Sequence, residues 1–201
     1  MKKEKIIQDY NIDNYQREII SNYLESLSSV NININLVGST TLKNFWDRHV
    51  LDSLQILDYI NKKNPSVLDM GTGAGIPGIF LNILKIKDIS LVDSRLKKIS
   101  FLENFIKDNK LTARAIHGRL EKIRLKKFDY IIARALSPLP KLINYSLFFS
   151  KKQSTCIFLK GRNVNKELID AKKKYLFDYK LFNSKSSGEG YVLIMKNIKK
   201  K

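Results

Sequence analysis

Residues 67–78, with the sequence VLDMGTGAGIPG, constrain the fold of this chain more than any other stretch. The short apolar run after Pro65 predicts a strand. The alternating glycines after it predict a turn that only residues without a Cβ can follow closely. Pro77 stands where a first helical turn is expected, because proline presets φ and has no amide to leave unpaired there. A strand, a glycine turn and a helix form the ligand-binding corner of a doubly wound α/β sheet.

Apolar runs and amphipathic stretches alternate along the rest of the chain after Ser66. Strands are expected near 66–69, 88–92, 113–117, 128–133 and 154–159. Helices are expected near 76–84, 95–108, 138–149 and 164–175. This alternation predicts a parallel sheet with right-handed crossovers. The last two apolar runs, 179–182 and 191–195, are joined by a polar connector that contains Gly188 and Gly190, which predicts an antiparallel hairpin.

The N-terminal segment has the spacing of helices. Apolar residues recur at helical intervals over 12–27 and again over about 41–60, where Ser39 or Thr40 could cap the second helix. Residues 1–5 are basic and are expected to form a frayed tail.

The length of 201 residues predicts one domain over 1–201. Within it we expect an N-terminal helical lobe at about 10–62 and a catalytic α/β core at about 65–196. We see no signal peptide and no apolar run near 18 residues, so we expect a soluble, cytoplasmic protein without a membrane partner. We also expect a monomer.

The chain carries 37 Lys and Arg against 19 Asp and Glu, a net charge of +18. Such an excess favours a polyanionic partner, most simply a nucleic acid. Of the basic residues, however, 29 are lysine, and the chain is also rich in Asn and Ile. AT-rich codons produce this mixture without selection for binding, so the scarce arginines carry more information than the lysines.

Cysteine and histidine usage limits the chemistry. The single cysteine, Cys156, excludes an internal disulfide, and its apolar surroundings predict a buried strand residue. Two histidines and one cysteine, spread along the chain, predict that no metal is bound.

Two cofactor interpretations compete for the glycine turn. Residues 73–78 satisfy G-x-G-x-x-G, which on its own is a weak dinucleotide signal. Asp93 ends the next strand about 20 residues later, where a carboxylate could hold the ribose of NAD or of S-adenosylmethionine (AdoMet). Asp69, just before the first glycine, favours AdoMet, because a carboxylate would repel a pyrophosphate but suits the ammonium group of a methionine moiety. Residues 69–78 look like the first motif of class I AdoMet-dependent methyltransferases.

Further candidates stand at the carboxyl ends of the later strands, where open parallel sheets bind ligands. Leu120 and Glu121 follow the third strand, at the place where an adenine would be flanked in this fold. The charged candidates are Arg119, Arg134 and Lys160. Each could be a solvated rim residue, but the apolar strands before the two arginines favour a ligand contact.

A polar segment, 48–53, lies in the second predicted helix. On an α-helix His49, Asp52 and Ser53 share one face at i, i+3 and i+4, with Arg48 adjacent. The face is either an exposed polar surface or part of a binding floor. An unperturbed histidine pKa near 6.5 also admits general-base chemistry.

Several of these segments occur together, in order and at fitting spacing, in one family. They resemble the bacterial ribosomal RNA small-subunit methyltransferases G, also called the glucose-inhibited division protein B family, over roughly residues 10–196. The matching segments are 35–37, 48–54, 69–78, 91–94 with Lys97 and Lys98, 132–135 and 159–161. One departure is Ala133, where serine would be expected to face the same site.

The resemblance implies a fold, a reaction and a cofactor site. The fold is a class I AdoMet-dependent methyltransferase fold, Rossmann-like, with a seven-stranded mostly parallel sheet ending in an antiparallel hairpin and with N-terminal helices. The reaction is methyl transfer from AdoMet to N7 of a guanine in 16S ribosomal RNA, either free or in a small-subunit particle. The AdoMet site implied by the resemblance comprises Gly71, Ile76, Leu120, Glu121 and Arg134, and our reasoning from the residues adds Asp69, Gly73 and Asp93.

Guanine N7 carries a lone pair and no proton, so this reaction needs no general base. We therefore expect Arg119, Arg134 and Lys160 to hold phosphates or the base edge, and His49 to belong to the RNA floor. Two other classes stay open at this point. One is a nicotinamide-dependent oxidoreductase, and the other is an RNA-binding ribosome-assembly factor that retains AdoMet without turnover.

Overall fold

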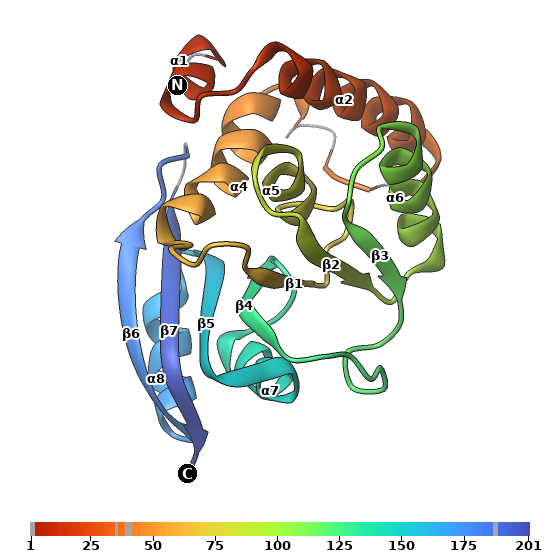
Figure 1. The fold of residues 1–201 in the computed structure, drawn as a ribbon. Coiled ribbons are helices and arrows are strands. Elements are labelled where there is room, and N and C mark those ends of the chain that lie inside the picture. The colour runs from red at the N-terminus through yellow and green to blue at the C-terminus, as the bar shows by residue number, and fades with distance from the viewer. Residues whose placement is uncertain (1–2, 35, 39–41, 187–188) are drawn as a thin grey trace.

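The computed structural model describes residues 3–34, 36–38, 42–186 and 189–201 (Figure 1). A seven-stranded sheet with the strand order β3-β2-β1-β4-β5-β7-β6 forms its centre. The strands are β1 Ser66–Met70, β2 Asp88–Asp93, β3 Arg114–His117, β4 Phe128–Arg134, β5 Ser150–Gly161, β6 Tyr175–Asn183 and β7 Gly190–Lys200. Strands β1 to β5 pair in parallel, whereas β7 runs antiparallel to both β5 and β6. The expected mostly parallel sheet with a terminal antiparallel hairpin is confirmed.

The centre of the sheet contains the point where the strand order reverses. β1 pairs with β2 on one side and with β4 on the other, and Met70 lies opposite both Val92 and Ala133. The three strands therefore end at the same level, and the residues that follow them meet at one edge. In open α/β sheets, ligands bind at this crevice.

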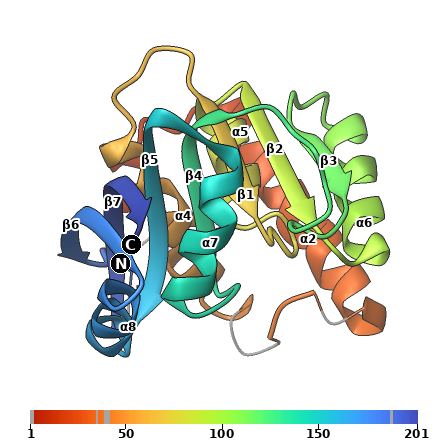
Figure 2. The same ribbon diagram turned by 90° about the horizontal axis from the view of Figure 1, so that it is seen from below.

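Helices cover both faces of the sheet (Figures 1 and 2). The main ones are α1 Lys3–Asp9, α2 Asn14–Ile34, α5 Gly78–Leu84, α6 Leu96–Asp108, α7 Leu139–Phe149 and α8 Val164–Lys172. One buried cluster joins α2, α5 and α6 to the sheet, with Tyr23 and Phe80 at its centre. The cluster on the opposite face joins α7 and α8 to the sheet. Because both faces are covered, every residue of β1 is buried.

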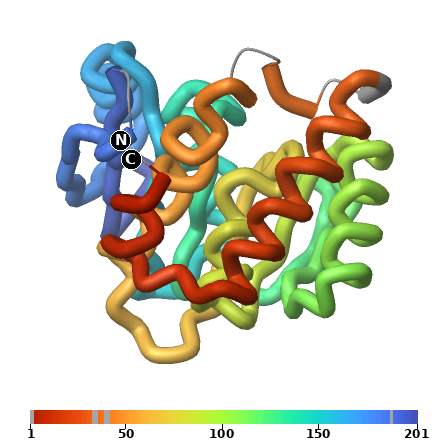
Figure 3. Tube along the Cα trace, turned by 90° about the horizontal axis from the view of Figure 1, so that it is seen from above, coloured from red at the N-terminus to blue at the C-terminus, as the bar shows by residue number. Residues whose placement is uncertain are grey.

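The N-terminal helix α2 lies alongside α6 (Figure 3) and reaches the glycine turn. The hydroxyl of Tyr23 donates a hydrogen bond to the carbonyl oxygen of Ala74 at 2.6 Å. Tyr23 is completely buried, so this contact connects the N-terminal helices to the ligand-binding corner.

The glycine turn has the predicted conformation. Gly71, Gly73 and Gly75 have φ angles of +64°, +62° and +95°, a region that residues with a Cβ rarely adopt. Pro77 immediately precedes α5, as expected for a proline at a helix start. Cys156 is buried in β5, also as expected.

Several boundaries differ from the sequence-based expectation. Residues 3–9 form α1 rather than a frayed tail, because the side chains of Ile6 and Ile7 are buried in the core. The helix α2 continues seven residues beyond the predicted end at residue 27. The strands β5 to β7 are longer than their apolar runs, since ladder hydrogen bonds extend pairing into polar residues.

The second predicted helix differs most. In place of one α-helix over 41–60, the chain forms a π-helix (η1, Trp46–Leu51), one α-helical turn (α4, Asp52–Leu54) and a 3₁₀-helix (η2, Gln55–Tyr59). The proposed caps, Ser39 and Thr40, lie outside the described residues. The wider π turn breaks the i, i+3, i+4 spacing. Ser53 is buried and donates to the carbonyl oxygen of His49 at 2.6 Å, so its predicted place on a polar binding face is wrong.

Within the ranges that the structure describes, no helix is both long and apolar enough to cross a membrane.

Candidate functional site

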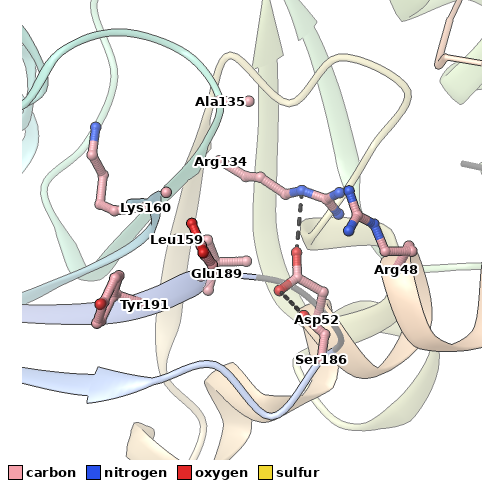
Figure 4. A pocket seen from close by; sticks show the side chains of 11 residues that line it. Arg48, Asp52, Arg134, Ala135, Leu159, Lys160, Ser186, Glu189 and Tyr191 are labelled. Atoms are coloured by element: carbon pink, nitrogen blue, oxygen red, sulfur yellow. Dashed lines mark hydrogen bonds and ion pairs between the residues drawn. The ribbon is translucent and has the colours of Figure 1, made fainter. Parts of the chain in front are cut away.

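Two cavities lie at the carboxyl edge of the sheet, on either side of the segment that follows β4. The turn cavity, of about 180 Å³, is lined by Gly71, Val92, Asp93, Ser94, Gly118, Arg119, Leu120, Glu121, Leu136 and Tyr145. The arginine cavity, of about 310 Å³ (Figure 4), is lined by Arg48, Asp52, Arg134, Ala135, Leu159, Lys160, Gly161, Ser186, Glu189, Gly190 and Tyr191. Arg134 and Ala135 line one cavity and Leu136 lines the other, so one short segment forms a wall of both.

Two carboxylates supply hydrogen-bond acceptors to the turn cavity. Asp93 accepts the amide of Gly73 at 2.9 Å through one oxygen and the amide of Arg95 at 2.9 Å through the other. Each carboxylate oxygen can accept a second hydrogen bond, so capacity remains for a ligand. Glu121 accepts the hydroxyl of Tyr145 at 2.5 Å, and this hydrogen bond lowers the pKa of Glu121.

The rest of the turn cavity suits an adenosine group. Val92, Leu120 and Leu136 give it an apolar wall beside the two carboxylates. A Cβ at Gly71 would lie 2.3 Å from Cδ1 of Leu136. Because glycine has no Cβ, Gly71 and Leu136 can both line the cavity without a steric clash. Ribose hydroxyls facing Asp93 and an adenine against the apolar wall match this donor and acceptor pattern, so the residues fit AdoMet.

Asp69 occupies a different position from the one expected. Its carboxylate is completely buried beneath the turn and lines neither cavity. One oxygen accepts the hydroxyl of Thr72 at 2.6 Å and the amide of Gly78 at 2.9 Å. Burial raises the pKa of Asp69 to about 7. This side chain therefore holds the turn together, and the expected contact with a methionine ammonium is not made from this position.

Three further residues line neither cavity. The amide of Gly73 orients Asp93, but Gly73 lines neither cavity. Ile76, expected in the cofactor site, packs into the core between the sheet and the N-terminal helices. Ala133 is buried in the core of the opposite face, so the expectation that this position faces the site is wrong.

The arginine cavity is organised around Arg134. Its Nε lies 3.2 Å from Oδ2 of Asp52, and the two side chains are only 22% and 15% exposed. Nη1 of Arg134 lies 3.5 Å from Nδ1 of His49. Arg48 extends from η1 and lines the same cavity as Arg134 (Figure 4). Two guanidinium groups in one cavity form a site for an anion such as a phosphate.

His49 supports this arrangement from behind. It is 3% exposed, packs against the ring of Phe45 with centroids 5.9 Å apart, and does not line the arginine cavity. Burial, helped by the positive charges of Arg134 and Arg48, lowers the pKa of His49 to about 4. The imidazole is therefore neutral near pH 7 and lies in the wall rather than on the surface where an RNA would contact it.

Asp52 also connects Arg134 to the connector between β6 and β7. Its Oδ1 accepts hydrogen bonds from the hydroxyl of Ser186 at 3.0 Å and from the side-chain amide of Gln55 at 2.9 Å. The side-chain oxygen of Gln55 in turn accepts a hydrogen bond from the backbone amide of Lys185 at 2.9 Å. Sequence reasoning had grouped Asp52 with His49 and Ser53 on one polar face, but had given it no role of its own in the site.

The three expected cationic ligands do not converge. The Nζ of Lys160 lies 2.6 Å from Glu167 and donates to the carbonyl oxygen of Ser137 at 3.2 Å. Lys160 lines the arginine cavity, but its side chain points away from Arg48 and Arg134 (Figure 4), so its expected contact with a phosphate or base stays a prediction. Arg119 is exposed and lines the turn cavity with the expected adenine residues, Leu120 and Glu121.

Two lining residues had no signal in the sequence. Leu136 and Tyr145 reach the turn cavity from the segment after β4 and from α7, and nothing in their local sequence distinguishes them from other core residues. Among the described residues, no group of three or more His, Cys, Asp or Glu side chains could hold a metal ion.

Comparison with known proteins identifies the family. Residues 16–195 match the family described as rRNA small subunit methyltransferase G. The chain belongs to this family. A relative named ribosomal RNA small subunit methyltransferase G, from Rickettsia typhi, is 38% identical over 170 residues, which cover 85% of this chain and 88% of the relative.

Solved structures show the same fold. A SAM-dependent methyltransferase from Aquifex aeolicus superposes with a TM-score of 0.58 at 16% identity, covering 76% of this chain and 92% of that one. M. jannaschii TYW2, solved in complex with AdoMet, superposes with a TM-score of 0.57 at 19% identity and covers 76% of each chain. The chain is thus an AdoMet-dependent methyltransferase of the G family, and the competing nicotinamide interpretation is wrong.

Proposed function

We propose that this protein methylates N7 of a guanine in 16S ribosomal RNA, with AdoMet as the methyl donor. The observation that carries the proposal is the segment 134–136, which lines both a cavity with apolar and carboxylate residues and a cavity with two guanidinium groups. A methyl donor in the first and a nucleotide in the second would be neighbours, and the methyl group would have to reach N7 past this segment. The names of the relatives and the net charge of +18 support an RNA substrate.

The residues of the turn cavity would hold the methyl donor. Asp93 would accept the ribose hydroxyls, and Leu120 with Glu121 would flank the adenine. Arg119 lines the same cavity, so we assign it to the donor side rather than to the RNA. Bound AdoMet would supply an electrophilic methyl group on a sulfonium centre.

The residues of the arginine cavity would hold the nucleotide. Arg48 and Arg134 can bind a phosphate or the O6 acceptor of a guanine, an edge that suits a basic side chain. Asp52 holds Nε of Arg134, and this contact fixes the direction in which the rest of the guanidinium points. Catalysis would rest mainly on alignment, which can supply about 7–11 kcal/mol of the barrier.

The positions of His49 and Asp52 favour N7 over substrate positions that carry a proton. His49 is buried and lines neither cavity, and Asp52 is paired with Arg134. Neither is placed to remove a proton from a substrate. Because guanine N7 has a lone pair and no proton, its attack on a methyl group needs no base.

The test compares 16S rRNA from strains with and without this gene by nucleoside mass spectrometry. The expected result is loss of one N7-methylguanosine on deletion, and its restoration when the purified protein and AdoMet act on small subunits from the deletion strain. Restoration with free 16S rRNA as well would show that the particle is not required. A methylated base other than N7-methylguanosine would overturn the proposed position.

The assembly-factor alternative makes a different prediction. Such a protein would bind the particle and AdoMet but would transfer no methyl group in the purified reaction. We favour the enzyme because the two cavities share a wall, an arrangement that RNA binding alone would not require.

A further inference from the structure

A third cavity, of about 320 Å³, lies on the open face of the β5-β7-β6 part of the sheet, beside η2. We call it the aromatic groove. It is lined by Asp58, Tyr59, Asn61, Thr155, Asp178, Tyr179, Lys180, Phe182, Ile194 and Lys196. The ring centroids of Tyr59 and Phe182 lie 5.1 Å apart with an angle of 35° between the rings. The groove therefore has an aromatic pair on one side and a polar rim around it.

The ring of Phe182 is partly open to solvent, at 39% exposure, on the face that also carries Tyr59. Tyr179 turns its ring to the other face of the strand, where Nζ of Lys172 lies 4.9 Å from the ring centre. Folding leaves this apolar area available, and accessible ring faces of this kind stack nucleobases with little preference for sequence.

The charges of the groove favour an anion. Asp58 is paired with Lys185, with Nζ and carboxylate oxygen 2.6 Å apart, and Asp178 accepts the side-chain amide of Asn197 at 2.6 Å. The exposed ammonium groups of Lys180 and Lys196 form no ion pair within the described part of the chain. Lys185 neutralises Asp58, whereas Asp178 keeps its negative charge because its partner is a neutral amide. The two lysines therefore exceed the one uncompensated carboxylate by one positive charge, which can face a phosphate backbone.

The groove lies along the same strand as the arginine cavity. Tyr191 of β7 lines the arginine cavity, and Ile194, three residues further along β7, lines the aromatic groove. Three residues of strand span about 10 Å. The two places are therefore close enough along β7 for neighbouring segments of one RNA to reach both.

We propose that the aromatic groove binds a single-stranded segment of the RNA substrate, next to the nucleotide held in the arginine cavity. One base stacks on Phe182 and Tyr59, and the neighbouring phosphates lie near Lys180 and Lys196. This inference rests on the proposed function, because it takes the substrate to be RNA.

The first test replaces the ring. Phe182→Leu keeps an apolar side chain on the strand but removes the stacking face, and Phe182→Tyr restores it. The matched control is Phe148→Leu, which removes an aromatic residue 50% exposed on α7. Binding is measured with an unmethylated 16S rRNA transcript and separately with small subunits from the deletion strain. We expect about tenfold weaker binding of both RNAs for Phe182→Leu only, the scale of one lost stack, with AdoMet affinity unchanged.

The second test removes the charges without touching the rings. The double variant Lys180→Gln/Lys196→Gln should lower the slope of log affinity against log salt by about 1.4, for two single-strand phosphate contacts. The control, Lys107→Gln/Lys152→Gln, neutralises two exposed lysines outside the groove and should have a smaller effect.

The outcomes test RNA binding by the groove independently of the proposed methylation reaction. Unchanged transcript affinity in Phe182→Leu, with a wild-type salt slope in the lysine double variant, overturns the proposal. Loss of affinity for the particle but not for the transcript also overturns it, because the groove would then contact a ribosomal protein. A wild-type enzyme that binds RNA without methylating it refutes the proposed function alone, since the binding results still test the groove.

Discussion

The carboxylate of Asp52, on the N-terminal side of the chain, lies 3.2 Å from Nε of Arg134 at the end of β4. The other oxygen of the same carboxylate accepts the hydroxyl of Ser186, in the connector of the terminal hairpin. One side chain thus joins three distant segments of the chain at the arginine cavity.

The first prediction follows from this contact. Asp52→Asn keeps an acceptor for Ser186 but leaves the Arg134 guanidinium without its anionic partner. We expect kcat/KM for methyl transfer to fall about ten- to hundredfold, the scale of one charged hydrogen bond. In an Arg134→Gln background the same change should cost little, because the two residues act as a pair. Additive losses in the double variant would show that Asp52 acts independently of Arg134.

The second prediction concerns Gly71. A Cβ there would lie 2.3 Å from Leu136, and φ is +64°, so Gly71→Ala should narrow the turn cavity and weaken AdoMet binding at least tenfold. Far-ultraviolet circular dichroism should stay near that of the wild type, since the turn lies at the sheet edge. Leu136→Ala in the same chain relieves the steric clash but not the strain from φ. Normal AdoMet affinity in Gly71→Ala would remove the turn from the cofactor site.

The third prediction concerns the role of His49 in catalysis. With its pKa lowered to about 4, the imidazole stays neutral from pH 6 to 8.5, so the single-turnover rate should be flat over this range. A flat profile alone does not exclude a general base with a pKa this low. The variant His49→Asn distinguishes the two roles, because it should retain part of the rate if His49 only supports the neighbouring residues. Normal RNA and AdoMet binding with no residual transfer would instead identify His49 as a general base.

The fourth prediction concerns stability and pH. The folded state binds a proton on His49 only near pH 4, whereas the unfolded state binds it near 6.5, so this group lowers the free energy of unfolding as pH falls between these values. Asp69, with its pKa raised from 3.8 to about 7, has the opposite effect and lowers stability as pH rises. Each slope reaches at most about 1.4 kcal/mol per pH unit, so the two oppose each other over roughly pH 4–6.5.

Urea unfolding at several pH values measures this opposition. In His49→Asn only the contribution of Asp69 to the pH dependence remains. The free energy of unfolding of this variant should therefore fall more steeply than that of the wild type as pH rises from 4.5 to 6. Asp69→Asn should show the reverse change. Parallel curves for wild type and His49→Asn would contradict the burial of a neutral imidazole.

The fifth prediction separates the two arginines that the structure assigns to different cavities. Arg48→Gln should weaken binding of 16S rRNA and lower its salt slope by about 0.7, for one single-strand phosphate contact. Arg119→Gln should lower AdoMet affinity and leave that slope unchanged, because Arg119 lines the turn cavity. A reduced salt slope for Arg119→Gln would show that Arg119 contacts the RNA.

Residue types and their spacing were enough to predict the sheet and the glycine-turn corner of the ligand site. The apolar runs marked all seven strands, and the glycines of 71–75 predicted the turn, because strand burial and positive φ angles are local requirements that residue types record. Asp93, Leu120 and Glu121 could be placed from the same logic, since Asp93 ends β2 and the other two lie within four residues of the end of β3.

Only the tertiary structure decided which of the charged candidates share a cavity. Arg119, Arg134 and Lys160 all stand at or near strand ends, yet Arg119 lines the turn cavity, Arg134 pairs with Asp52, and the ammonium of Lys160 pairs with Glu167. The position of a strand end predicts an edge of the sheet but not the direction of a long side chain. That direction depends on partners far away in the sequence, and on the π-helix that turns His49 and Asp52 toward Arg134, which no local pattern encodes.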